Sequence, residues 1–268
     1  MSPTKANAGK KREHDEREVG PANGDKTEVD QPPAKQSKTN NNTRSSRSKS
    51  SRQASGPDKS KLDAILSAYG VLPLQDLGLD KPNEATPETI LALVLHAMLT
   101  SARISHQLAY KSVKAVVDAG YHELETLKKS TWEERTVVLT EGGYTRYREK
   151  TATALGELAE FVEREYKGDL NNLLKRANSS PVKTRKLLQE IKGIGKVGVD
   201  IFFDTAQNVW PSLAPFIDPR SMETAEKCGL GKDVNAIWEA VGKDPEVLCK
   251  LASALTTLRL EKKEHEFQ

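Results

Sequence analysis

From about residue 61 to the end, the apolar residues recur with the spacing of helices rather than of strands. Between residues 87 and 100 they are so dense that a helix there is apolar nearly all round, which is typical of a core helix. Residues 245–260 instead carry a single apolar stripe, formed by Leu248, Leu251, Leu255 and Leu258. Sustained alternation of apolar and polar residues is absent, so the pattern predicts an all-α domain.

Several predicted helices begin with the same signal, a capping side chain followed by proline at the first helical position. Proline costs nothing there because its missing N–H would have no partner in the helix. The four pairs are Thr86-Pro87, Ser180-Pro181, Asp218-Pro219 and Asp244-Pro245. Thr131 and Glu134 add the spacing of a capping box.

Residues 1–60 have a different composition, which divides the chain into two parts. They contain no Leu, Ile, Phe, Tyr or Trp, so they cannot bury enough apolar surface to offset the entropy of ordering. They hold 13 basic and 8 acidic residues, whereas the whole chain has a net charge of only +3. We therefore predict a disordered basic arm over 1–60 and a helical domain over 61–268.

The same counts exclude several classes of protein. No apolar run approaches the roughly 20 residues of a membrane span, so no membrane partner is expected. Two cysteines, Cys228 and Cys249, are too few for a disulfide framework, an all-cysteine iron–sulfur cluster or a structural zinc site. We expect neither a metal nor a cofactor.

The basic cluster Lys10-Lys11-Arg12, with Lys35 and Lys38 further on, is consistent with a nuclear import signal. A solvated linker would carry similar short clusters by chance. A nuclear location is the expectation that this segment favours.

The most informative stretch is Gly193-Ile194-Gly195, between a charged helix that follows Ser180 and a second helix over about 196–206. Two glycines around one aliphatic residue allow a tight turn with Ile194 directed inward. Such a turn leaves the first N–H groups of the second helix without partners, and these groups can bind a nucleic-acid phosphate. The predicted contact residues are Lys192, Gly193, Ile194, Gly195, Lys196, Val197 and Gly198.

The letters from Gly193 to Gly198 also match G-x-G-x-x-G, and Asp218 follows about 20 residues later, as in dinucleotide-binding folds. That fingerprint requires a buried strand directly before the first glycine. Residues 183–192 are charged and helical in spacing, which argues against a nucleotide site.

From Thr86 to Leu260 the chain resembles the helix-hairpin-helix DNA glycosylase superfamily, the group of endonuclease III, adenine glycosylase and 3-methyladenine glycosylase. The resemblance rests on Ile191–Lys196, on Asp204-Thr205-Ala206, on Trp210-Pro211 and on Phe216-Ile217-Asp218 in that order. Leu99–Arg103 and Gly142-Gly143-Tyr144 are similar to two further elements of the family. The resemblance implies a two-lobed helical bundle that binds double-stranded DNA, here in the branch without an iron–sulfur cluster.

In this superfamily one aspartate stabilises the positive charge that builds on the sugar as the base leaves, and the matching position is Asp218. Members that also cleave the strand place a lysine two residues after the second glycine, where this chain has Val197. Lys196 lies one residue earlier, about 100° around the helix. The resemblance thus implies a monofunctional, hydrolytic enzyme, although a longer loop before Asp218 leaves a role for Lys196 open.

Four further residues are candidates through the same resemblance. Arg103 aligns with the side chain that fills the gap left by a flipped base, and His106, Tyr144 and Tyr147 are candidates for the wall of the base pocket. Each has a structural alternative: Arg103 as a solvated residue, His106 as a helix-surface residue, and Asp218 as a helix cap alone.

The leading hypothesis is therefore a base-excision repair glycosylase that acts as a monomer. A DNA-binding module of the same fold without catalysis is the alternative, and a helical protein-interaction domain is a third hypothesis. The sequence names neither the lesion nor any protein partner.

We predict that deleting the basic arm weakens binding to duplex DNA chiefly at low salt, because mobile positive charge adds a salt-dependent, nonspecific contribution. Fluorescence anisotropy over a salt series would measure this effect. An unchanged salt slope would contradict the prediction.

Overall fold

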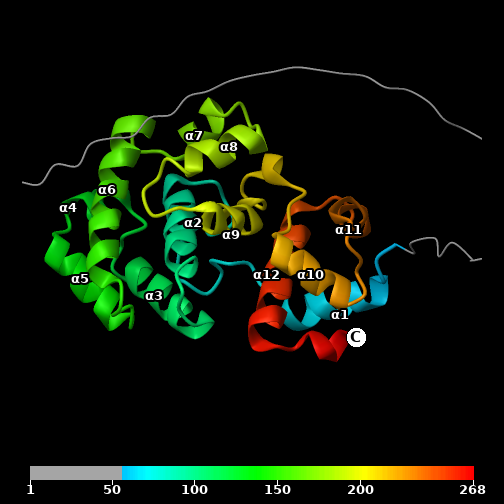
Figure 1. Cartoon of the computed structure of the whole chain (residues 1–268). Helices are drawn as coiled ribbons and strands as arrows, with labels where there is room; N and C mark the ends of the chain where they lie inside the picture. The colour runs from blue at the N-terminus through cyan, green and yellow to red at the C-terminus, as the bar shows by residue number, and fades with distance from the viewer. Residues whose placement is uncertain (1–55) are drawn as a thin grey trace, which may run out of the picture. The chain divides into compact units, whose positions relative to one another are not determined.

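The computed structural model describes residues 56–268, and in that part of the chain every regular element is a helix (Figure 1). The all-α prediction is confirmed for these residues. The arm predicted for residues 1–60 lies almost entirely outside them. The first helix begins at Lys59, capped by Asp58, so the helical domain starts slightly before the predicted boundary at residue 61.

Most helices follow one another with short connections, and the longest connection lies between α1 and α2. Their bounds are α1 Lys59–Tyr69, α2 Pro87–Thr100, α3 His106–Asp118, α4 Leu124–Lys129, α5 Trp132–Glu141, α6 Arg148–Tyr166, α7 Asn171–Arg176, α8 Pro181–Leu188, α9 Lys196–Ala206, α10 Pro219–Lys227, α11 Val234–Ala240 and α12 Pro245–Glu261. Two short 3-10 helices, η1 Pro211–Leu213 and η2 Glu264–Phe267, complete the set.

The predicted helix starts are confirmed, and each cap works as the sequence indicated. The hydroxyl of Thr86 accepts the N–H of Thr89 at 3.1 Å, and the carboxylate of Asp244 accepts the N–H of Glu246 at 2.8 Å. Thr131 and Glu134 form the reciprocal capping box of α5. These local contacts satisfy N–H groups that the helices themselves leave free.

The first of two apolar cores is formed by residues between Leu74, in the connection before α2, and Leu213 in η1. Helix α2 contacts both α3 and α9, and ten of its fourteen residues are buried. The dense apolar pattern of residues 87–100 therefore has the predicted consequence: α2 is a core helix.

The second core joins α1 to α10, α11 and α12. The apolar stripe of α12 is buried as predicted, at Leu248, Leu251, Leu255 and Leu258. Its partner α1 comes from the other end of the described chain, a pairing that the sequence pattern did not predict. Helix α9 contacts both α2 and α12, so it connects the two cores.

Among the described residues, no helix combines the length and the apolar character needed to cross a membrane.

Candidate nucleic-acid interface and acidic site

The turn between α8 and α9 requires glycine at its first position. Gly193 has a φ of 95°, and a Cβ added there would lie 3.1 Å from Cε of Met98 on α2. Ile194 is buried beneath the turn, as predicted, and its N–H donates to the carbonyl of Ile191 at 3.0 Å. The turn is thus fixed by its backbone and by its packing on α2.

Gly195, at the start of α9, has no such structural requirement. Its backbone is extended, with φ −92° and ψ −172°, and a Cβ added there would meet nothing within 4 Å. No side chain caps α9, in contrast to α8 and α10 beside it in the sequence. The helix therefore presents partial positive charge and free N–H groups toward open space, as an anion site requires.

The start of α9 lies against the end of α2. A Cβ on Gly198 would be 3.3 Å from Cγ2 of Ile194 and 3.6 Å from Oγ of Ser101. Arg103 follows in the connection to α3; it is exposed and forms no ion pair with another described residue. The structure thus brings the segment of Arg103 close to the turn, two features far apart in the sequence.

The positive charge at this turn is smaller than the sequence suggests. Lys192 forms an ion pair with Glu157 of α6, and Arg185 forms one with Asp200. Lys196 is exposed and, within residues 56–268, has no ionic partner. Val197, which occupies the position of the lyase lysine in the family, is also exposed, at 43%.

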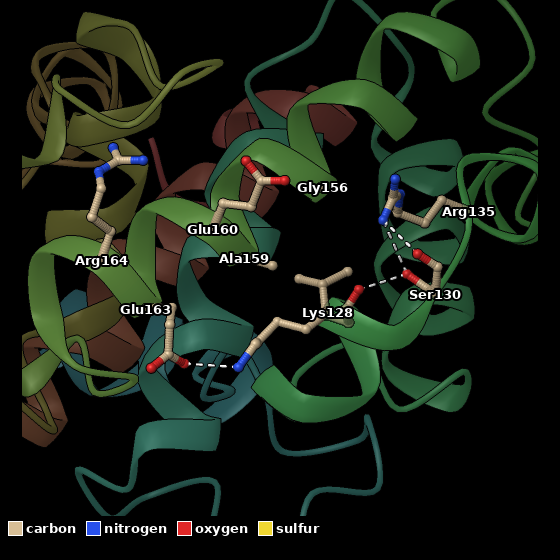
Figure 2. Close-up of a pocket in the computed structure, with 9 residues that line it drawn as sticks. Lys128, Ser130, Arg135, Gly156, Ala159, Glu160, Glu163 and Arg164 are labelled. Carbon is tan, nitrogen blue, oxygen red and sulfur yellow. Dashed lines mark hydrogen bonds and ion pairs between the residues drawn. The ribbon is translucent and has the colours of Figure 1, made fainter.

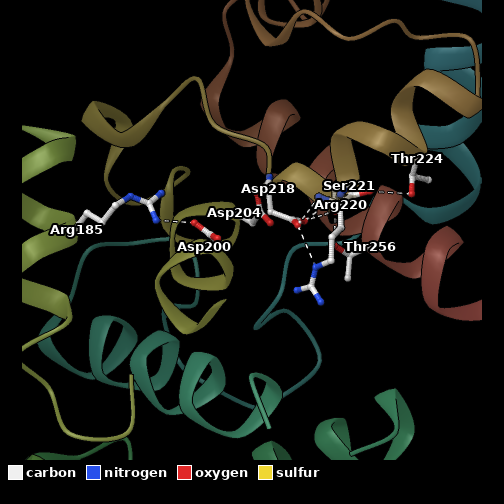
Figure 3. Close-up of polar contacts among 8 residues, drawn as sticks. All are labelled: Arg185, Asp200, Asp204, Asp218, Arg220, Ser221, Thr224 and Thr256. Atoms are coloured by element: carbon white, nitrogen blue, oxygen red, sulfur yellow. Dashed lines mark hydrogen bonds and ion pairs between the residues drawn. The ribbon is translucent and has the colours of Figure 1, made fainter. Parts of the chain in front are cut away.

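Asp218 caps α10, as its place before Pro219 indicated (Figure 3). Its carboxylate accepts the N–H of Arg220 at 2.9 Å, the N–H of Ser221 at 3.3 Å and the hydroxyl of Ser221. Burial by itself raises the pKa of Asp218, but the Ser221 and Arg220 hydrogen bonds and the guanidinium of Arg259 outweigh it and lower the pKa below its usual value. The carboxylate is therefore ionised at neutral pH.

The structure places this carboxylate under cover, which the sequence did not indicate. Asp218 is 4% exposed, and Nε of Arg220 lies 3.6 Å from its Oδ1. The Arg220 side chain is itself 52% exposed and runs beside the acid (Figure 3). Arg220 is therefore one of the residues that enclose the carboxylate, together with Ser221 and Asp204.

Two cavities of the described residues lie elsewhere. One, of about 540 Å³, lies between α4, α5 and α6, where Lys128 pairs with Glu163 and Arg135 donates to Ser130 (Figure 2). The other, of about 570 Å³, lies between the start of α2, the start of α4 and the end of α6. Neither is lined by Asp218.

Asp204 on α9 is a second acid at this site, to which the sequence reasoning gave no role. The N–H of Asp218 donates to its Oδ1 at 2.9 Å, and Asp204 is 6% exposed. Burial, and then the charge of Asp218, raise the pKa of Asp204 well above the usual 3.8. The signal in the sequence that could have identified Asp204 is its place between Phe203 and Ala206, as an acid on a largely apolar helix.

This raised pKa predicts how stability depends on pH. The folded state keeps the Asp204 proton to higher pH than the unfolded chain, so ionisation of Asp204 destabilises the fold as the pH rises above about 3.8. Asn cannot ionise. We expect the free energy of unfolding of Asp204→Asn at pH 8 to exceed that of wild type by at least about 1 kcal/mol. This figure is the low end of the usual cost of burying a polar group without adequate hydrogen bonds. Urea unfolding at pH 4, 6 and 8 would measure a difference that shrinks toward pH 4; a constant difference would contradict the explanation.

Gln207 at the end of α9 holds the segment that leads to Asp218. Its amide nitrogen donates to the carbonyl of Phe216 at 3.0 Å, and its amide oxygen accepts the N–H of Phe216 at 3.3 Å. The guanidinium of Arg185 lies over the rings of Phe203 and Phe216, at 4.5 and 5.3 Å. Side chains of α8 and α9 thus fix the approach to Asp218.

The predicted pocket residues do not gather at Asp218. His106 is exposed at the first position of α3. Tyr144 is buried in the first core, and Tyr147 is half-buried with its ring 6.5 Å from that of Tyr144. Within the described residues, no hydrogen bond or aromatic contact connects any of the three to the acid. Their place in a base pocket stays a prediction.

His96 on α2 is a histidine that sequence reasoning missed. It is half-buried, and its Nδ1 is buried without a hydrogen-bond partner among residues 56–268. Burial, with a smaller contribution from His106, lowers its pKa to about 4. His96 is therefore neutral at physiological pH.

No cluster of three or more His, Cys, Asp or Glu side chains within residues 56–268 has the arrangement of a metal site. Comparison of the chain with protein-family models and with curated protein sequences found no match.

Proposed function

We propose that this protein is a DNA glycosylase of base excision repair, with the helix-hairpin-helix fold, in which α8, the turn and α9 form the hairpin. The observation that carries the proposal is the arrangement along α9. This one helix has an uncapped N-terminus at its start and holds the backbone of Asp218 through Asp204, roughly 12 Å further along at 1.5 Å per residue.

The start of α9 would bind a DNA phosphate. The open space over Gly195 lets a phosphate approach the N–H groups, and exposed Lys196 adds a charge beside them. Arg103, in the neighbouring connection, would enter the duplex where a base has left it. Phosphate contacts of this kind position the duplex without reading its sequence.

Asp218 would supply the chemistry. Cleavage of the N-glycosidic bond builds positive charge on the deoxyribose, and an ionised carboxylate near the anomeric carbon stabilises it. Water would be the nucleophile, because an exposed valine, Val197, stands where a lyase lysine is required. In this proposal the side chain of Arg220 moves from Asp218 to a DNA phosphate when the duplex binds.

A second function is favoured by one observation, the cover over Asp218. The carboxylate is 4% exposed and already accepts three hydrogen bonds, so its role as a helix cap is enough to explain its position. A protein with this arrangement could bind duplex DNA and recognise lesions without cleaving a bond. A decisive experiment must therefore separate binding from base release.

Incubation of the purified full chain with a panel of duplexes would make that separation. The panel contains an alkylated guanine, an oxidised guanine, uracil, hypoxanthine and a G·T mispair, and alkali cleavage reveals abasic sites. We expect base release on at least one duplex and no adduct after borohydride. Binding without release on every duplex would favour the second function, and a trapped adduct would assign lyase chemistry to a lysine such as Lys196.

We further propose that the protein acts as a monomer on nuclear DNA. The basic residues of the N-terminal segment support this location through Lys10-Lys11-Arg12. Imaging of the tagged full chain against a variant with these three residues changed to Ala would test it.

A further inference from the structure

We propose that Asp204 is a positioning residue that acts as a neutral carboxyl group and holds Asp218 in place for the reaction. This inference deepens the proposed function and rests on it, because Asp218 is the acid of that reaction.

The geometry of the pair carries the proposal. Asp204 accepts the backbone N–H of Asp218 at 2.9 Å, and both residues are buried, at 6% and 4% exposure. Asp204 belongs to α9 and Asp218 to the start of α10, so this bond joins the helix of the turn to the helix that Asp218 caps. With Gln207 fixing Phe216 two residues earlier, the acid has little freedom to slide along α9.

The charges around Asp204 favour its neutral form. Asp200 lies one turn earlier on α9 and Asp218 faces it from α10, and both are acids. From α12 the side chains of Cys249 and Arg259 lie nearby, and the Arg259 charge also reaches Asp218. Asp200 is already paired with Arg185, at 2.5 Å. Arg185 thus pairs with Asp200 and Arg220 pairs with Asp218, and Asp204 lies beside a carboxylate that stays ionised.

A neutral carboxyl group can do what a carboxylate cannot. Its carbonyl oxygen can accept the N–H of Asp218 while its hydroxyl donates a hydrogen bond to the carboxylate of Asp218, and such a bond raises the pKa of Asp204 and lowers that of Asp218. If Asp204 lost its proton, two negative charges would face each other in a buried site. The rate of base release should therefore fall at alkaline pH, while binding of the duplex changes less.

Two substitutions separate this role from general structural support. Asp204→Asn keeps an acceptor for the N–H of Asp218 and a donor for its carboxylate at every pH. Asp204→Ala keeps neither. Thr205→Ala is the matched control: Thr205 is the next residue of α9, is similarly buried, and bonds only to the carbonyls of Ile201 and Phe202.

The readouts are the single-turnover rate of base release on the panel duplex that wild type processes, the affinity for an undamaged duplex, and NMR titration of the Asp side-chain carboxyl carbons. We expect Asp204→Ala to lose at least about 30-fold in rate with less than about 3-fold change in affinity. Asp204→Asn and Thr205→Ala should stay within about 3-fold of the wild-type rate at neutral pH. Of these two variants, only Asp204→Asn should also keep its rate of base release at alkaline pH, where the wild-type rate falls.

The NMR titration keeps this inference distinct from the proposed function. A carboxyl resonance of Asp204 that titrates at the usual aspartate pKa would overturn the inference even if the enzyme is active. A loss of rate in Asp204→Asn as large as in Asp204→Ala would overturn it as well. If wild type releases no base, the proposed function fails. The positioning role is then still supported by a raised pKa of Asp204, together with an Asp218 amide resonance that is unchanged in Asp204→Asn and shifted in Asp204→Ala.

Discussion

Asp218→Asn should lower the rate of base release by about 100- to 1000-fold, the usual cost of removing a group that stabilises charge in the transition state. Asn is isosteric with Asp and caps helices about equally well, so α10 should keep its start. What disappears is the negative charge that Asp218 carries in the folded protein. Single-turnover alkali-cleavage assays on the responsive panel duplex would measure the effect.

The matched control is Asp233→Asn. Asp233 caps α11 in the same manner, accepting the N–H of Asn235 at 2.8 Å, and it is exposed. It should leave both rate and thermal stability near the wild-type values. Because Asp218 also faces Arg259, its variant should be shown by circular dichroism to remain folded. A folded Asp218→Asn protein that releases base at the wild-type rate would show that another group supplies the charge.

Gly195→Asp should weaken binding to an undamaged duplex by at least about 10-fold, or about 1.4 kcal/mol, without destabilising the fold. The position has ordinary backbone angles and open space, so a side chain fits. Asp would cap α9, with a gain of a few tenths of a kcal/mol, and would place a negative charge where the phosphate is proposed to bind. Fluorescence anisotropy and thermal unfolding would measure the two effects separately.

Two companion variants identify the cause. Gly195→Ser also caps α9 but carries no charge, so it should lose less affinity than Gly195→Asp. Gly193→Ala should instead destabilise the protein by about 1–2 kcal/mol, because φ at Gly193 is 95° and Met98 leaves little room for a Cβ. Unchanged DNA affinity in Gly195→Asp would remove the start of α9 from the proposed interface.

The fold class and the helix starts were predictable because they depend on neighbours in the sequence. A cap such as Thr86 or Asp244 bonds to N–H groups two or three residues later. The inward position of Ile194 follows equally from the two glycines that flank it. The dinucleotide hypothesis could be rejected for the same reason, and the residues before Gly193 indeed form α8 and no strand.

The environment of the acid was not predictable in this way. Asp218 was singled out by a motif, yet its burial and its bond to Asp204 depend on how α9 and α10 pack. Likewise Lys192 counted as free positive charge until the structure paired it with Glu157, 35 residues away. A count of charges cannot register pairs formed by residues distant in the chain.

The sequence by itself thus determined an all-helical domain, the beginnings of its helices, the glycine turn and the identity of one candidate acid. The first three follow from backbone conformation and capping, which act over a few residues, whereas the acid was singled out by the family resemblance. Only the tertiary structure decided that α1 packs on α12, that the turn lies beside the segment of Arg103, and that Asp218 is buried against a second acid. The reason is that burial and the resulting pKa values depend on which surfaces meet, and surfaces meet only when the whole chain has packed.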